Sequence, residues 1–245
     1  MSESSEKLLV SWKGPKTKKN YFVGVLSKSD HAYEVNYKFF YNKEVVLQAE
    51  EEGFRPFVGL KDLNKEYYSE KLFSVFERRL PNQNRHIFKK IIHDYQLQNS
   101  DDVTWEYLKI TKGRTATDNL SFLEPVYMDH DKLIYIGEIA GWSYTKSNNS
   151  HLEVNAPLVL RNDENNTDDT EAVEVINSNN GNARVGYIPK PFNKVFNTLL
   201  KKDYFLSGYV RSIDSYDGRP TIAVEKRVFR KDIDAKLNYL IHMKS

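Results

Sequence analysis

The chain of 245 residues contains no cysteine, which excludes disulfide bonds, thiolate catalysis, Cys-ligated zinc and iron–sulfur clusters. It also lacks any apolar run close to the about 20 residues that a membrane span needs. The segment from Met1 to Lys7 is rich in Ser and Glu and has no apolar core typical of a signal peptide. We therefore expect a cytoplasmic protein with no membrane association.

Neither sign of charge is in large excess, because the net charge is only +2. A charged partner must then be attracted by local clusters rather than by the whole protein. The common phosphate-cradling glycine patterns and the nucleophile elbow are absent. An acidic segment, residues 163–169, lacks the central Gly and the final Glu of a calcium loop. The six His residues are scattered: His31, His86, His93, His130, His151 and His242. We expect no enzymatic activity, no metal and no cofactor.

Aromatic residues are plentiful, with 16 Tyr and 13 Phe in a chain that is 40% hydrophobic. Each large ring buries about 150–250 Å², which compensates for the modest aliphatic content. The chain is therefore expected to form a packed core.

The first half of the chain contains both the two-residue periodicity of strands and the 3.6-residue periodicity of helices. Alternating apolar residues predict strands over residues 8–12, 21–26 and 33–37, with a basic turn at 13–20. Helical spacing predicts helices over residues 43–52, 69–79, 84–95 and 103–109. Gly53 is placed to end the first helix, and Asp101 or Asp102 to cap the last.

From Lys132 onward, apolar residues recur at every second position, which is the period of β-strands. Strands are predicted over residues 133–139, 152–161, 172–176, 184–188, 204–213 and 221–228. One helix is expected to follow Pro191 and end at Lys202, and a short helix is expected in the tail after Lys231. Many short strands with one helix indicate a small β-barrel. The predicted fold class is α+β, with a mixed strand and helix domain at residues 1–127 and a small barrel at 128–245.

Two sequence blocks carry a family resemblance in the second half. They are NNTDDTEAVEV at residues 165–175 and RVGYIPK at residues 184–190. In this order, and with a helix after the second block, they resemble the HIRAN domain over roughly residues 130–230. The resemblance implies an OB/SH3-like barrel that holds single-stranded DNA by a 3′ end.

The first half resembles the N-terminal region of HipA-type proteins. The residues that carry this likeness are YFVGVL at 21–26, YEVNY at 33–37, YSEKLFSVFERRL at 68–80 and GRTATD at 113–118. No kinase core follows, because the chain has neither a His-Arg-Asp loop nor an Asp-Phe-Gly motif. The resemblance implies a regulatory fragment without its enzyme.

The HIRAN resemblance assigns roles to individual residues. It places Asp169 where a carboxylate accepts a hydrogen bond from the terminal 3′ hydroxyl. Tyr187 falls at the polar aromatic position and Lys190 at the phosphate-binding one, with Arg184 assisting. The segment from Gly141 to Tyr144 aligns with a strand of the family and offers Tyr144 or Trp142 as a ring on which a base stacks.

Each of these residues also has a purely structural interpretation. Asp169 is a common type of turn residue, and Tyr187 alternates in a strand and would then only pack. Lys190 would be a solvated surface residue, while Tyr144 and Trp142 would belong to the barrel core. The acidic loop also departs from the family, because Asp168 replaces an aromatic residue. Its carboxylates repel phosphate: Asp163, Glu164, Asp168 and Asp169.

Basic residues cluster at two places in the first half. A predicted hairpin tip beside Trp12 and Tyr21 carries Lys13, Lys16, Lys18 and Lys19. A second group surrounds predicted helix ends: Arg78, Arg79, Arg85 and Arg114. Both are either phosphate contacts or solvated surface.

Two functions follow from these patterns. The first is a non-catalytic nucleic-acid-binding protein that recognises single-stranded DNA or a DNA 3′ end. The alternative is a protein-interaction module, such as an antitoxin-like regulator of a HipA-type kinase or a phage-defence component. Its partner would be a kinase-type toxin, a helicase or a nuclease. The kinase-less first half and the acidic loop favour this alternative.

Overall fold

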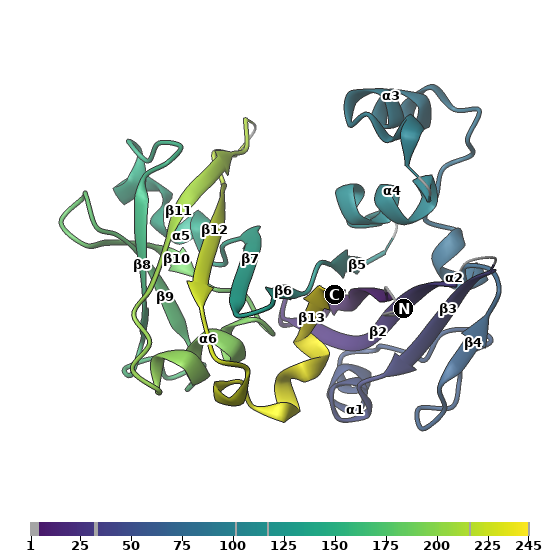
Figure 1. Ribbon diagram of the computed structural model, residues 1–245, viewed down its shortest axis with the longest axis horizontal. Coiled ribbons are helices and arrows are strands. Elements are labelled where there is room, and N and C mark those ends of the chain that lie inside the picture. The colour runs from purple at the N-terminus through teal and green to yellow at the C-terminus, as the bar shows by residue number, and fades with distance from the viewer. Residues whose placement is uncertain (1–4, 32–33, 101, 117, 216, 245) are drawn as a thin grey trace. The chain divides into compact units, whose positions relative to one another are not determined.

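A computed structural model describes residues 5–31, 34–100, 102–116, 118–215 and 217–244. The chain divides into two compact units, Met1–Pro125 and Val126–Ser245. In Figure 1 the first unit runs from purple to teal and the second from teal to yellow. Both units combine sheets with a few helices, so the α+β class is confirmed.

The first unit is built on a five-stranded antiparallel sheet of order β4-β3-β2-β1-β5. The strands are β1 (Ser5–Lys13), β2 (Asn20–His31), β3 (Glu34–Tyr41), β4 (Tyr67–Ser69) and β5 (Leu120–Leu123). The three strands predicted from alternation are present and longer than expected. Strand β5 was not predicted; it pairs with β1 from Leu9–Leu123 to Trp12–Leu120.

The helices of the first unit are α1 (Lys43–Glu51), α2 (Ser74–Glu77), α3 (His86–Asp94) and α4 (Val103–Thr111). The predicted helix over 69–79 is wrong in extent, because only its centre is helical. Its first residue, Ser69, instead ends strand β4 and pairs with Tyr37 of β3, so tertiary pairing overrides local helix propensity there. Asp102 caps α4 as predicted, accepting a hydrogen bond from the Trp105 N–H at 3.0 Å. Asp101 lies outside the described residues.

Aromatic rings dominate the core of this unit. The Phe76 ring lies 5.2 Å from that of Phe39 and 5.5 Å from that of Phe122, and all three side chains are buried. Helix α3 packs on α4 rather than on the sheet (Figure 1), with Phe88 stacked on Tyr107 at 5.2 Å.

The second unit contains an eight-stranded sheet of order β10-β9-β8-β11-β12-β7-β6-β13. Its strands are β6 (Val126–Asp129), β7 (Lys132–Glu138), β8 (Pro157–Asn162), β9 (Val173–Asn177), β10 (Ala183–Tyr187), β11 (Leu206–Ile213), β12 (Pro220–Arg227) and β13 (Ile241–Lys244). The predicted helix is α6 (Asn193–Leu200), whose Phe196 packs on Tyr135. The tail forms 3-10 turns, η3 (Arg230–Asp232) and η4 (Ala235–Leu240), and then strand β13 parallel to β6, which was not predicted.

A single β-bridge pairs Tyr187, at the end of β10, with Ala140, two residues after the end of β7. Tyr187 and Ala140 exchange two backbone hydrogen bonds, of 2.8 and 3.0 Å. Gly186 permits this approach, since a Cβ there would lie 2.5 Å from the Ala140 carbonyl oxygen. The pairing is a single bridge rather than a ladder, so a closed barrel stays a prediction.

Candidate nucleic-acid interface

The loop between β8 and β9 is held together by Asn166. The Asn166 Oδ1 accepts the N–H groups of Asp168 at 3.1 Å and Asp169 at 2.9 Å. Its Nδ2 donates to Asp163 Oδ2 at 3.2 Å. This local pattern is typical of an Asx-type turn, and it gives the loop, residues 163–171, a fixed shape.

Asp169 occupies the centre of the loop's polar contacts. Its Oδ2 receives the Lys190 ammonium at 3.1 Å and the Asn193 Nδ2 at 3.0 Å. Its Oδ1 accepts the N–H of Glu171 at 3.1 Å. The side chain is 20% exposed and that of Lys190 is 55% exposed. Asp169 is therefore a turn residue and, at the same time, a solvent-accessible carboxylate beside a cation.

Asn193 anchors this carboxylate to helix α6 and was not predicted as a site residue. It is buried in the first turn of the helix, and its Nδ2 also donates to the Glu171 carbonyl at 3.1 Å. One turn later, buried Asn197 donates to Asn162 Oδ1 at 3.0 Å. Two Asn residues four apart on the apolar face were the sequence signal for this contact.

Tyr187 is the centre of a second group of polar contacts, which involves the same loop. Its hydroxyl donates to Asp163 Oδ2 at 2.8 Å and accepts from Arg184 Nη1 at 2.6 Å. The Arg184 guanidinium lies over the Tyr187 ring, 4.9 Å from its centroid. Burial and the bond to Asp163 raise the pKa of Tyr187. The Tyr187 hydrogen bond lowers the pKa of Asp163, so this carboxylate stays ionised at neutral pH.

Opposite charges alternate across the outer faces of β8, β9 and β10. Glu174 on β9 receives Arg161 from β8 at 2.9 Å and Arg184 from β10 at 3.1 Å. Because Arg161 and Glu174 are directly opposite in the ladder, the ion pair follows from strand register. The cations next to Tyr187 are thus neutralised by neighbouring carboxylates.

The structure brings the three main predicted residues into one hydrogen-bonded network. Asp163 and Asn166 link the hydroxyl of Tyr187 to the backbone N–H of Asp169, whose carboxylate contacts Lys190. Arg184 joins the same network through Tyr187. Of the loop's other carboxylates, Glu164 and Asp168 are exposed.

The two candidate stacking rings have different environments. The predicted strand at Gly141 to Tyr144 is wrong, because Trp142–Thr145 forms the short helix α5. Trp142 is buried and its Nε1 donates to the Asp217 carbonyl at 3.2 Å, so its ring is a core side chain unavailable for stacking. Tyr144 is 88% exposed. Gly141, which precedes α5, packs beside the Tyr187 ring.

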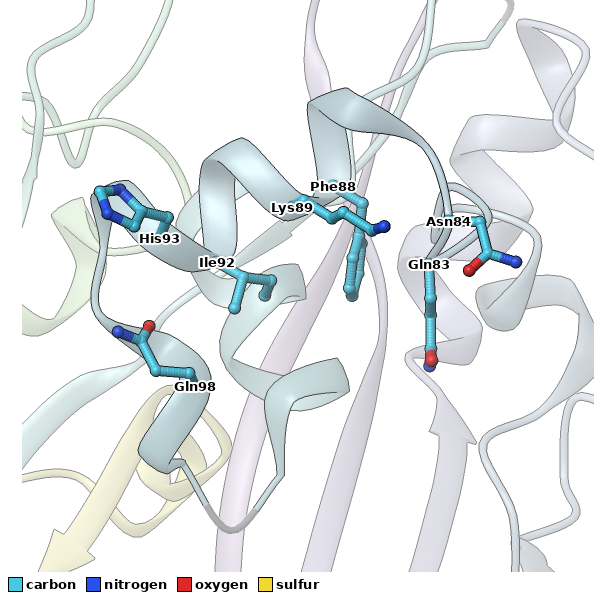
Figure 2. Close-up of a pocket in the computed structure, with 7 residues that line it drawn as sticks. All are labelled: Gln83, Asn84, Phe88, Lys89, Ile92, His93 and Gln98. Atoms are coloured by element: carbon cyan, nitrogen blue, oxygen red, sulfur yellow. The ribbon is translucent and has the colours of Figure 1, made fainter.

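A cavity of about 440 Å³ lies in the first unit beside α3 and does not contain any of these residues. Figure 2 shows its lining: Gln83, Asn84, Phe88, Lys89, Ile92, His93 and Gln98. These side chains include no carboxylate and no hydroxyl nucleophile. Among the described residues, no group of three or more His, Asp or Glu side chains is placed to hold a metal ion. No helix in the described part of the chain is both long and apolar enough to cross a membrane.

The chain is an α+β protein whose second unit matches the HIRAN domain family over residues 134–228. The match covers β7 to β12 and therefore includes the network around Asp169 and Tyr187. The resemblance of the first unit to the N-terminal region of HipA-type proteins remains a prediction.

Solved structures similar to the chain include the HIRAN domain of human HLTF. That domain is 18% identical, with 44% of this chain and 85% of that chain covered and a TM-score of 0.36. A protein from Lactobacillus plantarum is 19% identical, with 39% and 98% covered and a TM-score of 0.33. These likenesses are too weak to support an argument about fold or function. None of the curated proteins matches the chain.

Proposed function

We propose that this protein binds single-stranded DNA at a free 3′ end through its second unit, without catalysis. The observation that carries the proposal is the contact of Lys190 with Asp169 Oδ2 at 3.1 Å, on a loop tied to Tyr187. A terminal nucleotide offers one hydroxyl donor and an adjacent phosphate. A carboxylate beside a lysine is complementary to both groups.

Binding in this site requires an exchange of partners. The ammonium of Lys190, on a half-exposed and flexible side chain, moves from Asp169 to the phosphate nearest the end. The hydroxyl then donates to the Oδ2 atom that Lys190 has left, while Asn193 and the Glu171 N–H keep the carboxylate in place. Each buried or half-buried charge is therefore paired both before and after binding.

Tyr144 is the proposed platform for the terminal base. Its ring is 88% exposed, and it belongs to helix α5, which directly follows Gly141 beside the Tyr187 ring. Stacking of a base on an aromatic ring contributes about 1–3 kcal/mol. Arg184 already covers a face of Tyr187, so we assign Tyr187 to positioning Asp163 rather than to stacking.

The test compares two labelled oligonucleotides of identical sequence, one with a 3′ hydroxyl and one with a 3′ phosphate. Fluorescence anisotropy at fixed salt should give tighter binding to the hydroxyl end by about ten- to a hundredfold, the value of a hydrogen bond to a charged group. An oligonucleotide blocked at its 5′ end serves as the control and should bind like the unblocked one. Equal affinity for hydroxyl and phosphate 3′ ends would contradict the proposal.

A protein partner is the second candidate function, favoured by exposed apolar side chains on the first unit. Ile87 on α3 is 54% exposed and Tyr95 at its end is 58% exposed. Scattered exposed apolar residues are common, so this proposal depends on partner capture. Co-purification of a kinase core, helicase or nuclease encoded beside this protein supports it. Loss of that capture in the Ile87→Ser, Tyr95→Ser variant would assign the surface.

A further inference from the structure

The turn between β1 and β2 is fixed by a single carboxylate beneath it. We call residues 13–19 the basic hairpin. Glu52, at the end of α1, accepts the backbone N–H groups of Lys16 at 3.2 Å and Thr17 at 3.0 Å. It also accepts the Tyr21 hydroxyl at 2.6 Å and the Thr17 hydroxyl. The hydrogen bonds from Thr17 and Tyr21 lower the pKa of Glu52 to about 2, so the anchor stays ionised.

Close packing at Gly14 completes this anchor. A Cβ at Gly14 would lie 2.2 Å from Glu52 Oε2, so glycine is needed for the carboxylate to enter the turn. The backbone closes with hydrogen bonds from Gly14 N–H to Lys19 O at 2.8 Å and from Lys18 N–H to Gly14 O at 3.1 Å. The ring of Trp12, packed edge-on against Phe54 at 5.4 Å, supports the base of the hairpin.

The four lysines of the hairpin are all exposed. They are Lys13, Lys16, Lys18 and Lys19. Within the described part of the chain, none of them forms an ion pair with a carboxylate. Glu52 is satisfied by neutral donors, so it holds the backbone without pairing with a lysine ammonium.

The neighbouring segment adds to the positive charge. Lys13 N–H donates to the Asn119 carbonyl at 2.9 Å. Arg79 donates to the carbonyls of both Gly113 and Leu120, so exposed Arg114 follows a residue held beside the start of β5. The acidic side chain there, Asp118, is paired with Arg79. Exposed Glu51 on α1 is a further carboxylate close to Tyr21 at the base of the hairpin. Among these described residues, the four lysines and Arg114 outnumber the carboxylates Glu51 and Glu52.

We propose that the basic hairpin is a second nucleic-acid contact, which binds the phosphate backbone without regard to sequence or ends. Unpaired lysines on a fixed turn attract successive phosphates and release their counterions. The surface does not depend on the 3′-end site of the second unit. It would add affinity along a strand wherever both surfaces meet the same molecule.

The chemistry favours a nucleic acid over an anionic membrane. Amphipathic helices that bind firmly at a membrane surface insert large apolar side chains beside their basic residues. Among the described residues, the exposed large apolar side chains lie elsewhere, and none belongs to the hairpin. A contact made by lysine ammonium groups alone fits a backbone of phosphates.

The experiment uses the full chain and a circular single-stranded DNA, which has no 3′ end. Binding is measured between 50 and 200 mM salt for the wild type and for the variant Lys13→Gln, Lys16→Gln, Lys18→Gln, Lys19→Gln. The matched control carries Lys61→Gln, Lys65→Gln, Lys71→Gln, Lys90→Gln, four exposed lysines of the same unit beside β4 or on α3. Thermal unfolding checks that both variants fold.

Four phosphate contacts on a single strand give a log–log salt slope of about −2.8, or about fiftyfold weaker binding over that range. We expect the hairpin variant to lose most of this slope and to bind at least about tenfold more weakly at 50 mM salt, and the control variant to bind like the wild type. Equal binding by both variants would overturn the proposal. So would tight hairpin-dependent binding to phosphatidylserine vesicles or polyglutamate with none to the circle. Because the circle has no end, these outcomes are independent of the test of the 3′-end site.

Discussion

The two candidate contact surfaces, one in each unit, hold their cations in opposite ways. In the second unit, Lys190 contacts Asp169, and both Arg161 and Arg184 contact Glu174. In the first unit, the carboxylate under the basic hairpin takes its hydrogen bonds from backbone N–H groups and hydroxyls. The lysines above it keep their charge unpaired.

Under the two proposed functions, this difference separates a surface that selects its ligand from one that attracts any chain of phosphates. A ligand of the second unit must displace an internal ion pair, so it has to supply an anion for the cation and a donor for the carboxylate. A ligand that supplies only one of them leaves a charge unpaired, and this disfavours the wrong ligand. The hairpin makes no such demand, because its lysines release only mobile counterions.

The largest expected effect comes from Asp169→Asn, which removes the hydroxyl acceptor's charge. The preference for a 3′ hydroxyl over a 3′ phosphate should fall by about ten- to a hundredfold, since a charged hydrogen bond is lost. Anisotropy with the paired oligonucleotides measures it. Asp168→Asn, one residue earlier and exposed, is the matched control and should keep the preference. An unchanged preference in the Asp169 variant would remove the carboxylate from the mechanism.

Asn193→Ala tests whether the position of Asp169 matters apart from its charge. The variant leaves the Glu171 carbonyl and Asp169 Oδ2 without the Asn193 donor, so it should lower the free energy of unfolding by about 1–3 kcal/mol. Chemical denaturation measures this loss. Asn197→Ala, one turn later, loses its bond to Asn162 instead and serves for comparison. Only the Asn193 variant should also lose end preference; equal loss in both would make Asn193 merely structural.

Tyr187→Phe probes the link between the two halves of the network. It keeps the ring beneath Arg184 but removes the hydroxyl that binds Asp163. We expect a loss of less than about 1 kcal/mol in unfolding free energy, because the pair is partly solvated. Loss of the hydrogen bond should also bring the pKa of Asp163 up toward its ordinary value, which carboxylate chemical shifts in an NMR titration report. An Asp163 pKa that does not move would show that another contact holds it.

The sequence predicted the positions of strands and helices better than it predicted which segments pair with one another. Alternation located β1, β2 and β3, and the Arg184 to Pro189 block located β10 and the helix after it. Strands β4, β5, β6 and β13 were missed. Each is only three or four residues long, and β5 and β13 pair with strands that are distant in sequence. The Trp142 error has a similar origin, because a resemblance aligns residues without showing which are buried.

The candidate site was predicted only in part for the same physical reason. Asp169, Lys190 and Tyr187 were found from two short blocks, and the structure brings them into one network. Their supporting residues, Asn166 and Asn193, act through hydrogen bonds that depend on how a loop meets a helix. The hairpin lysines were visible in the sequence, but the anchoring role of Glu52, over 30 residues away, was not.

The smallest expected effect concerns this anchor. The folded pKa of Glu52, about 2, lies below its ordinary value of 4.5, so the stabilisation is present above about pH 4.5 and is lost as the pH falls toward 2. Over that window the wild type should take up about one more proton on unfolding than Glu52→Gln does, which makes its stability more sensitive to acid. Denaturation series between pH 5 and pH 2 measure the two slopes. At neutral pH the variant keeps all four lysines on a looser turn, so it should bind the circular strand more weakly than the wild type and more tightly than the lysine variant. Parallel pH slopes for wild type and variant would mean that Glu52 does not hold the turn, and the lysines would then act as independent, mobile charges.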